Sequence, residues 1–261
     1  MSKNQYLTAA HEHGIATITM NRPEVYNAFN DGLTYELQGA LKAAKKDKEV
    51  RVIVITGSGK AFSSGQDLKD HAAHEGRPFS ESLHKRYNPI IKSLRKIPKP
   101  VICRLNGVAA GAGCSLALAC DIILAAEEAI LIEVFVNIGL VLDSGSSYFL
   151  PRVLGYNRAF EISTMGTKVT ANQALDWGMV NAVVPLEELD QLVKKYTDYY
   201  VQAPTKAIGM MKRMLNKSYG SSLKEVLQFE AYYQDKAGAT KDHKEGVTAF
   251  SEKRSPQFKG S

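Results

Sequence analysis

Two loops of small residues follow apolar, strand-like runs and have the composition of an anion-binding site. Residues 54–67 read VITGSGKAFSSGQD, and residues 101–115 read VICRLNGVAAGAGCS. Ligands of α/β sheets bind beyond the carboxyl ends of the strands, and small residues let a ligand approach the backbone. A helix that begins in the second loop leaves its first N–H groups unpaired. The pattern predicts two backbone donors for one oxyanion, although glycine-rich loops also form tight turns.

A single carboxylate, Asp143, follows an apolar run in NIGLVLDSG (137–145). Apolar surroundings raise the pKa of a carboxyl group and make the carboxylate a better base. An aspartate before Ser144 and Gly145 also suits the N-cap of a helix. The residues alone leave both interpretations open, a general base or a helix cap.

Several kinds of site are not supported by the motifs. Neither loop matches GxGxxG or GxxxxGK[ST], so we expect no dinucleotide or ATP site. No cysteine lies in a CxxC pair and no HExxH occurs, so we expect no metal site and no cofactor. The histidines of the polar segment are better explained by a mobile, solvated lid; they are His71, His74 and His84.

The chain is basic, with a net charge of +6 and a pI near 9.0 over 261 residues. Such a charge favours solubility or the steering of an anionic ligand. The basic residues are scattered along the sequence, and Lys42, Lys45, Lys46 and Lys48 are typical of a solvated helix face. We therefore expect no nucleic-acid partner. No apolar run is long enough to span a bilayer, and the polar N-terminus lacks a signal sequence, which favours a cytoplasmic protein without a membrane partner.

The elements that position these loops form an α/β pattern. Residues 5–20 predict a hairpin, and Asn30 with Asp31 can cap a helix that runs to about residue 46. Further segments are two buried strands at 51–57 and 100–107, a loop at 60–68, a helix at 80–96, a helix within 109–121 and two short strands within 121–134. Helical patterns dominate from residue 144. We expect an α/β body at 1–195 and a helical C-terminal region at 196–261.

The chain resembles the crotonase (enoyl-CoA hydratase/isomerase) superfamily over nearly its whole length. The matching segments, in family order, are NRPEVYNAFN (21–30), ITGSGKAFSSGQDL (55–68), PKPVICRLNGVAAGAGCSLALACD (98–121), NIGLVLDSGSSYFLPRVLG (137–155), ALDWGMVNAVV (174–184) and EGVTAFSEKRSPQF (245–258). The resemblance implies a spiral of ββα turns with a helical C-terminal trimerisation part. It also implies a homotrimer or homohexamer that acts on an acyl-CoA.

By motif position, the resemblance assigns the two oxyanion donors to the backbone N–H groups of Gln66 and Ala112. It places the CoA ester along the two loops and the 21–30 segment. Arg22 and Lys253 are phosphate partners by charge, or else ordinary surface cations. The predicted substrate-binding residues are Arg22, Val25, Ala28, Ser63, Ser64, Gly65, Gly111, Ser115, Phe135 and Lys253.

The resemblance places the two catalytic glutamates of a hydratase at Ser115 and Phe135, and neither position carries a carboxylate. Asp143 matches the catalytic aspartate of several isomerases and of a dehalogenase in the superfamily. Glu133 lies two residues before Phe135, so on a strand it shares a face with that position and could reach the pocket to assist Asp143, but exposure is the favoured interpretation. For the remaining candidates we expect structural roles: a helix cap or a cation partner for Asp67, a turn for Asp121, and core packing for Tyr148, Phe149 and Trp177.

The expected reaction is a proton shift through a thioester enolate, with Asp143 as the base. Within the superfamily, the chain is most similar to the branch that converts ring-1,2-epoxyphenylacetyl-CoA to oxepin-CoA; isomerisation of 3-enoyl-CoA to 2-enoyl-CoA is the other reaction expected. An enoyl-CoA hydratase is the alternative. A non-catalytic acyl-CoA-binding or RNA-binding homologue is another, which an organised basic face would favour. Dehalogenation is disfavoured, because Phe135 and the Tyr87-Asn88 pair stand where a tryptophan and a histidine are expected.

Overall fold

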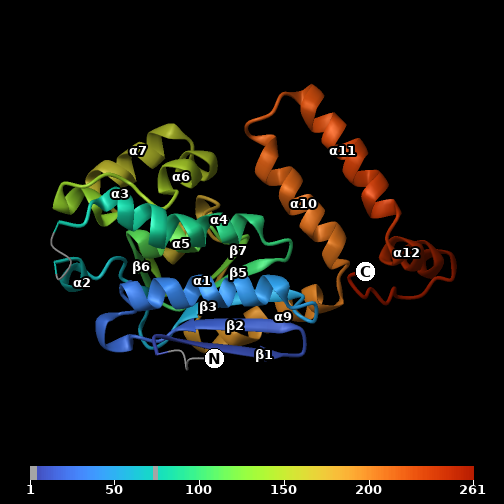
Figure 1. The fold of residues 1–261 in the computed structure, drawn as a ribbon, viewed down its shortest axis with the longest axis horizontal. Helices are drawn as coiled ribbons and strands as arrows, with labels where there is room; N and C mark the ends of the chain where they lie inside the picture. The colour runs from blue at the N-terminus through green and yellow to red at the C-terminus, as the bar shows by residue number, and fades with distance from the viewer. Residues whose placement is uncertain (1–4, 73–75) are drawn as a thin grey trace.

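The computed structural model describes residues 5–72 and 76–261, which form two sheets and a set of surrounding helices (Figure 1). The larger sheet has the order β1-β2-β3-β5-β7-β10 and the smaller one β4-β6-β8-β9. The strands of the larger sheet are β1 Leu7–Glu12, β2 Ile15–Met20, β3 Val52–Gly57, β5 Val101–Leu105, β7 Ile122–Ala126 and β10 Ala182–Val184. Those of the smaller sheet are β4 Ala61–Ser63, β6 Val108–Ala110, β8 Ile130–Ile132 and β9 Lys168–Thr170.

The central strands of the larger sheet are buried on both faces between two layers of helix, while most residues of the edge strand β1 are exposed. In β3, Ile53 and Ile55 belong to one apolar core, while Val52 and Val54 belong to the other. Successive side chains of a strand point to opposite faces, so a continuous apolar run is what a strand covered on both sides requires. Helix α1 (Asp31–Lys46) packs against β1 and β2, and α9 (Leu189–Gln202) packs against β3, β5 and β7.

The predicted spiral of ββα turns is confirmed. The pairs β3–β4, β5–β6 and β7–β8 each supply one strand to each sheet, and β4, β6 and β8 pair in parallel. The hairpin at 5–20 and the α1 helix are also confirmed, with Asn30 accepting a hydrogen bond from the Leu33 N–H at 2.8 Å. The prediction of a loop at 60–68 was wrong in part, because Ala61–Ser63 pairs with β6 as strand β4.

The predicted helix at 80–96 consists of three consecutive helical pieces, α3 (Phe79–Ser82), a π-helical turn (Leu83–Tyr87) and α4 (Asn88–Lys96). The other helices of the body are α2 Leu68–Ala72, α5 Ala112–Leu118, α6 Ser146–Leu154, α7 Tyr156–Met165 and α8 Ala171–Asp176. Short 3₁₀ helices occupy Pro23–Val25, Val134–Ile138 and Leu186–Glu188.

The C-terminal helices α10 (Thr205–Ser218), α11 (Leu223–Gly238) and α12 (Lys241–Ser251) extend away from the body as an arm (Figure 1). The expected boundary at residue 195 falls inside α9, which packs on the sheet. The arm exposes many large apolar side chains, which are Met211, Leu215, Tyr219, Leu223, Leu227, Val247 and Phe250. Such faces suit contact with further copies of the chain, and trimerisation stays a prediction.

The aromatic residues assigned to the core differ in burial. Phe149 is buried, as predicted, and Trp177 is half-buried under the guanidinium of Arg158. The prediction for Tyr148 was wrong, since 43% of the residue is exposed. It lies on α6 and lines a groove between the body and α10, where its ring adds to the apolar lining.

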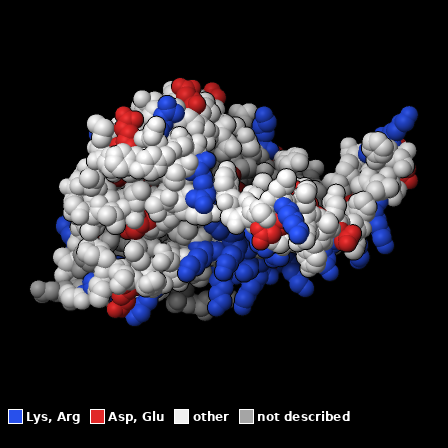
Figure 2. Space-filling model, turned by 90° about the horizontal axis from the view of Figure 1, so that it is seen from above, with Lys and Arg blue, Asp and Glu red and all other residues white. Residues whose placement is uncertain are grey.

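Basic residues that are separate in the sequence gather where the arm leaves the body. Figure 2 shows Lys and Arg side chains concentrated in that region. The pocket there is lined by Lys45, Lys46, Lys48, Arg51, Lys99, Lys206, Arg213, Lys236, Lys241 and Lys259. The interpretation of the basic residues as scattered was therefore wrong in three dimensions. Among the described residues, no helix combines the length and apolar character that crossing a membrane requires.

Asp121 attaches the arm to the body. We expected a turn role, but its carboxylate accepts a hydrogen bond from the Val101 N–H at 2.9 Å and pairs with Lys212 of α10 at 2.6 Å. Arg95 of α4 lies 3.4 Å from the other carboxylate oxygen. Lys212 is only 7% exposed, so its ammonium group depends on this partner.

Replacing Lys212 by methionine should lower the free energy of unfolding by about 3 kcal/mol, because a mostly buried carboxylate then loses its closest cation. Urea denaturation measures the change. Lys206→Met is the control on the same helix, since Lys206 is exposed, and it should change stability by less than about 0.5 kcal/mol. Equal effects of the two substitutions would contradict the anchoring role of Lys212.

Candidate active site

The first loop is held open by pairing with the 22–29 segment. The Phe29 N–H donates to Gly65 O at 2.7 Å, and the Asp67 N–H donates to Phe29 O at 3.0 Å. This pairing skips Gln66, whose N–H has no acceptor among the described residues. Gly65 has a φ of +89°, and a Cβ there would lie 2.7 Å from Ala110 O. Only glycine permits this approach of the two loops.

The second loop turns into α5 at Gly111, which has a φ of +51° and donates its N–H to Ile132 O at 2.9 Å. Ala112 is the first residue of α5, so its N–H has no partner within the helix. A Cβ on Gly65 would lie 3.5 Å from Ala112 N, which shows how close the two loops are. The structure thus brings the Gln66 and Ala112 segments together. Their donation to a single oxygen stays a prediction.

Asp143 lies at a sharp corner before α6. Ser144 has a φ of +50° and Gly145 one of +93°, so the chain reverses within two residues. Burial raises the pKa of the Asp143 carboxyl above its usual value, and Oδ1 is buried without a hydrogen-bond partner among the described residues. The N-cap of α6 is Gly145, and no side chain caps the helix. The helix-cap interpretation of Asp143 was therefore wrong.

Glu133 is buried, contrary to the expectation that it would be exposed. Its residue is 1% exposed, and its Oε2 has no hydrogen-bond partner within the described parts of the chain. Burial raises the pKa of this carboxyl to about 7, partly offset by the hydroxyl of Ser146. A signal in the sequence could have shown this. Glu133 directly follows β8 and is two residues from Leu131, which is buried. Residues two apart along a strand point to the same face, here the buried one.

The two positions of the hydratase glutamates lie beside these groups but carry no carboxylate. Ser115 is fully buried, with its Oγ 2.6 Å from Ser146 Oγ and 3.2 Å from Asp143 O. Phe135 is 7% exposed, and a Cβ on Gly111 would lie 3.7 Å from its Cζ. An apolar ring therefore stands next to the second loop, where a water-binding group would be needed for hydration.

The comparisons with known proteins agree with this arrangement. The family model for enoyl-CoA hydratase/isomerase matches residues 10–261. The chain belongs to the enoyl-CoA hydratase/isomerase family. It is 40% identical to the 1,2-epoxyphenylacetyl-CoA isomerase of Escherichia coli, over 98% of this chain and 99% of that one. It is 39% identical to a probable enoyl-CoA hydratase of Rhodobacter capsulatus, over 95% of each chain. The crystal structure of an enoyl-CoA hydratase from Bacillus anthracis superposes with a TM-score of 0.92 at 31% identity, covering 98% of this chain and all of that one.

The 22–29 segment, to which the family resemblance assigns CoA contacts, is tied to the first loop by hydrogen bonds. Ser64 donates through its N–H to Tyr26 O and through its hydroxyl to Val25 O, while Ser63 Oγ donates to Asn27 O. Ala28 is buried at the edge of this contact, where its carbonyl accepts from Arg22 at 2.6 Å. The predicted residues Val25, Ala28, Ser63, Ser64 and Gly65 therefore lie together in two connected segments, of which Ala28, Ser63 and Gly65 are buried.

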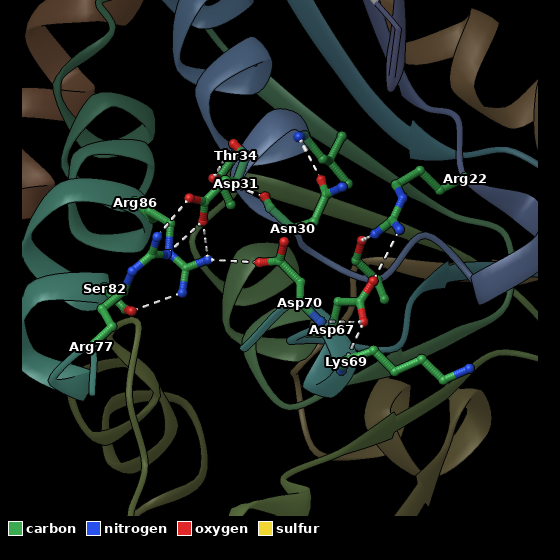
Figure 3. Close-up of polar contacts among 12 residues, drawn as sticks. Arg22, Asn30, Asp31, Thr34, Asp67, Lys69, Asp70, Arg77, Ser82 and Arg86 are labelled. Atoms are coloured by element: carbon green, nitrogen blue, oxygen red, sulfur yellow. Dashed lines mark hydrogen bonds and ion pairs between the residues drawn. The ribbon is translucent and has the colours of Figure 1, made fainter. Parts of the chain in front are cut away.

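Arg22 already has partners within the protein. Its guanidinium pairs with Asp67 at 2.9 Å, and its side chain is only 13% exposed (Figure 3). Asp67 also accepts from the N–H groups of Lys69 and Asp70, so both predicted roles of Asp67, the helix cap and the cation partner, are confirmed. Contact of Arg22 with a phosphate stays a prediction. Lys253 is exposed and lies two residues beyond the end of α12, and its contact with a phosphate stays a prediction.

Charged groups link the segment after the first loop to α1. Asp31 at the start of α1 pairs with Arg77 at 2.8 Å and with Arg86 at 2.5 Å (Figure 3). Arg86 is 1% exposed and its second partner is Asp70 at 3.4 Å. His84 is exposed, and the predictions for His74 and for the side chain of His71 lie outside the described residues. In the described parts of the chain, no group of His, Cys, Asp and Glu could hold a metal ion.

Replacing Glu133 by glutamine should remove a pH dependence of stability. The pKa of Glu133 is raised from 4.5 to about 7, so between these values the unfolded chain releases a proton that the folded chain keeps. The free energy of unfolding of the original protein should therefore fall by about 3 kcal/mol relative to the Glu133→Gln variant as pH rises through this window. Urea denaturation at several pH values measures the difference. Parallel curves for the two proteins would contradict the raised pKa.

Proposed function

We propose that this protein is an acyl-CoA isomerase that moves a proton through an oxyanion-stabilised thioester enolate, with Asp143 as the base. One observation carries the proposal. A buried carboxyl with a raised pKa and an unpartnered oxygen lies at the α6 corner, while Ser115 and Phe135 occupy the positions of the hydratase glutamates. A base of this kind can remove a weakly acidic proton only if the charge that develops is stabilised.

The backbone N–H groups of Gln66 and Ala112 are proposed to supply that stabilisation. For a 3-enoyl-CoA, the Asp143 carboxylate removes a proton from C2, and the electron pair moves through the carbonyl onto the thioester oxygen. The two N–H groups hold the resulting oxyanion. The electron pair then returns as C4 takes the proton from the neutral Asp143 carboxyl, which leaves a 2,3 double bond and restores the carboxylate. No water is consumed.

Two substrate classes fit this arrangement of one base and two oxyanion donors. The 40% identical relative from Escherichia coli is named for 1,2-epoxyphenylacetyl-CoA, which supports a ring epoxide converted to an oxepin-CoA. The same base and oxyanion donors also serve 3-enoyl-CoA isomerisation. We propose a homotrimer or homohexamer as the working assembly, because the arm exposes apolar residues such as Leu215, Leu223 and Phe250.

Two alternatives have specific support. Some relatives are named enoyl-CoA hydratases, but addition of water needs a polar group to hold the water, and Phe135 supplies none. The basic pocket at the arm is the observation that favours binding of a polyanion such as RNA. It lies at the amino ends of β3 and β5, opposite the loops of Gln66 and Ala112, so it would act separately from the isomerase site.

Purified protein should convert trans-3-hexenoyl-CoA to the conjugated 2-enoyl-CoA and should hydrate crotonyl-CoA poorly. The physical reason is that one carboxyl can transfer a proton between two carbons but cannot both activate and orient a water. The ultraviolet absorbance of the conjugated thioester follows both reactions. Efficient addition of water to crotonyl-CoA, without isomerisation of hexenoyl-CoA, would overturn the proposed function in favour of a hydratase.

Asp143→Asn should abolish turnover while the affinity for the CoA ester changes by less than about tenfold, or ~1.4 kcal/mol. The amide keeps the shape of the side chain but cannot accept the proton. Isothermal titration with a non-reactive acyl-CoA measures affinity, and steady-state kinetics measures turnover. Asp176→Asn is the control, since Asp176 is exposed on α8. Turnover close to normal in Asp143→Asn would exclude Asp143 as the base.

A further inference from the structure

A chain of hydrogen bonds connects the buried Glu133 to the backbone of Asp143. Glu133 Oε1 lies 2.8 Å from Ser146 Oγ, the first residue of α6. Ser146 Oγ lies 2.6 Å from Ser115 Oγ of α5, and Ser115 Oγ lies 3.2 Å from Asp143 O. Ser115 and Ser146 are fully buried and Glu133 is 1% exposed, so these contacts do not exchange with bulk water. The chain joins the end of β8, α5 and the corner that carries the proposed base.

The protonation state of Glu133 decides in which direction the hydrogen bonds of this chain are donated. Each serine hydroxyl donates one hydrogen bond, and an ionised carboxylate only accepts. When Glu133 is ionised, Ser146 donates to Glu133 and Ser115 donates to Ser146. The carbonyl oxygen of Asp143 then receives nothing from Ser115.

A Glu133 that carries its proton on Oε1, the oxygen in contact with Ser146, can reverse the direction. Its hydroxyl donates to Ser146, Ser146 donates to Ser115, and the Ser115 hydroxyl is free for a carbonyl. The carbonyls within reach are Asp143 O and Gly111 O, each 3.2 Å from Ser115 Oγ. The first belongs to the corner of the proposed base, and the second to the loop of the proposed oxyanion donor. Both are parts of the proposed catalytic arrangement.

We propose that Glu133 is a positioning residue that, in its protonated form, donates through Ser146 and Ser115 to the backbone of the Asp143 and Gly111 loops and holds them in place. This inference rests on the proposed function, because it assigns Glu133 to the site in which Asp143 acts. Glu133 acts through the serines and does not touch the substrate.

The surroundings of Glu133 favour its protonated form. The titratable groups that act on it are the thiol of Cys114 on α5 and the carboxyl of Asp143, and burial is the largest influence on its pKa. Asp143 is a like charge, so it also disfavours a second carboxylate. Within the described chain, no cation is among the groups that act on Glu133. A neutral Glu133 therefore lets Asp143 alone carry the negative charge.

The backbone corner at Ser144, next to the proposed base, is a conformation that needs stabilising contacts. Ser144 is a non-glycine residue with a φ of +50°, which costs free energy unless surrounding contacts maintain it. Small displacements of a catalytic group lower the rate strongly. When Glu133 loses its proton, the Ser115 donor turns away from Asp143 O. Turnover should therefore decrease on the alkaline side of the Glu133 titration.

The test compares the original protein with Glu133→Gln and Ser115→Ala, using trans-3-hexenoyl-CoA across the range from about pH 5 to 9. Glutamine is neutral and keeps an N–H donor for Ser146. The kcat of the original protein should fall severalfold as pH rises through about 7, the pKa of Glu133, and the kcat of Glu133→Gln should not. Ser115→Ala removes the donor to the two carbonyls and should lower kcat roughly tenfold at every pH with little change in KM.

Two matched controls separate this role from a general effect of substitution. Ser163→Ala removes a buried hydroxyl of α7 that has no hydrogen-bond partner among the described residues, and Glu128→Gln alters an exposed carboxylate. Both should behave like the original protein. The inference is overturned if Glu133→Gln loses activity at alkaline pH as the original does, or if Ser115→Ala keeps full kcat.

A measurement without turnover distinguishes failure of this inference from failure of the proposed function. Hydrogen exchange followed by mass spectrometry should show the peptide spanning 139–150 exchanging faster in the original protein than in Glu133→Gln at pH 8, but equally at pH 6. Ser115→Ala, which lacks the donor to Asp143 O, should exchange faster at both. Equal exchange in all three proteins overturns the inference. Absence of isomerisation together with the predicted exchange pattern would overturn only the proposed function.

Discussion

The site depends on the burial of two carboxyl groups that no cation among the described residues neutralises. Asp143 and Glu133 both have raised pKa values, and burial is the largest cause for each. Two buried cations elsewhere in the protein do have carboxylate partners: Lys212 pairs with Asp121, and Arg86 with Asp31. Burying an unpaired carboxylate is costly, so a fold that does it twice in one place must gain something other than stability. The gain proposed here is a base of raised pKa, held by a neutral neighbour.

The surrounding fold holds the two loops next to these carboxyl groups in position. The loops of Gln66 and Ala112 follow β4 and β6 of the smaller sheet, and the approach of these loops requires glycine at two contacts. A Cβ on Gly65 would meet Ala110 O at 2.7 Å, and one on Gly113 would meet Ser63 O at 2.5 Å. These contacts are between backbone atoms, which cannot move aside as a side chain can. The first turn of α5 therefore packs closely against the first loop. The N–H of Ala112, the first residue of α5, has no partner within the helix.

The arm and the basic pocket belong to a different part of the molecule. The arm is attached through Lys212 and Asp121, and its exposed apolar residues lie on helices that are not needed to complete the loops of Gln66 and Ala112. The basic pocket combines side chains from α1, α10, α11 and the C-terminal tail. Because like charges repel, such a concentration is favourable only if the surroundings or a bound anion compensate for it.

The sequence by itself determined the order of the elements, the two small-residue loops and the absence of carboxylates at Ser115 and Phe135. These features are local: apolar runs such as 51–57 form buried strands, and Asn30 caps α1 through its own side chain. The sequence also pointed to Asp143, but it left open whether that residue capped a helix. Only the tertiary structure decided this, along with the burial of Glu133, the exposure of Tyr148 and the gathering of the lysines. Burial and the pKa of a carboxyl depend on which distant segments pack around it, and Glu133 meets Ser146 and Asp143 only because β8, α5 and α6 converge.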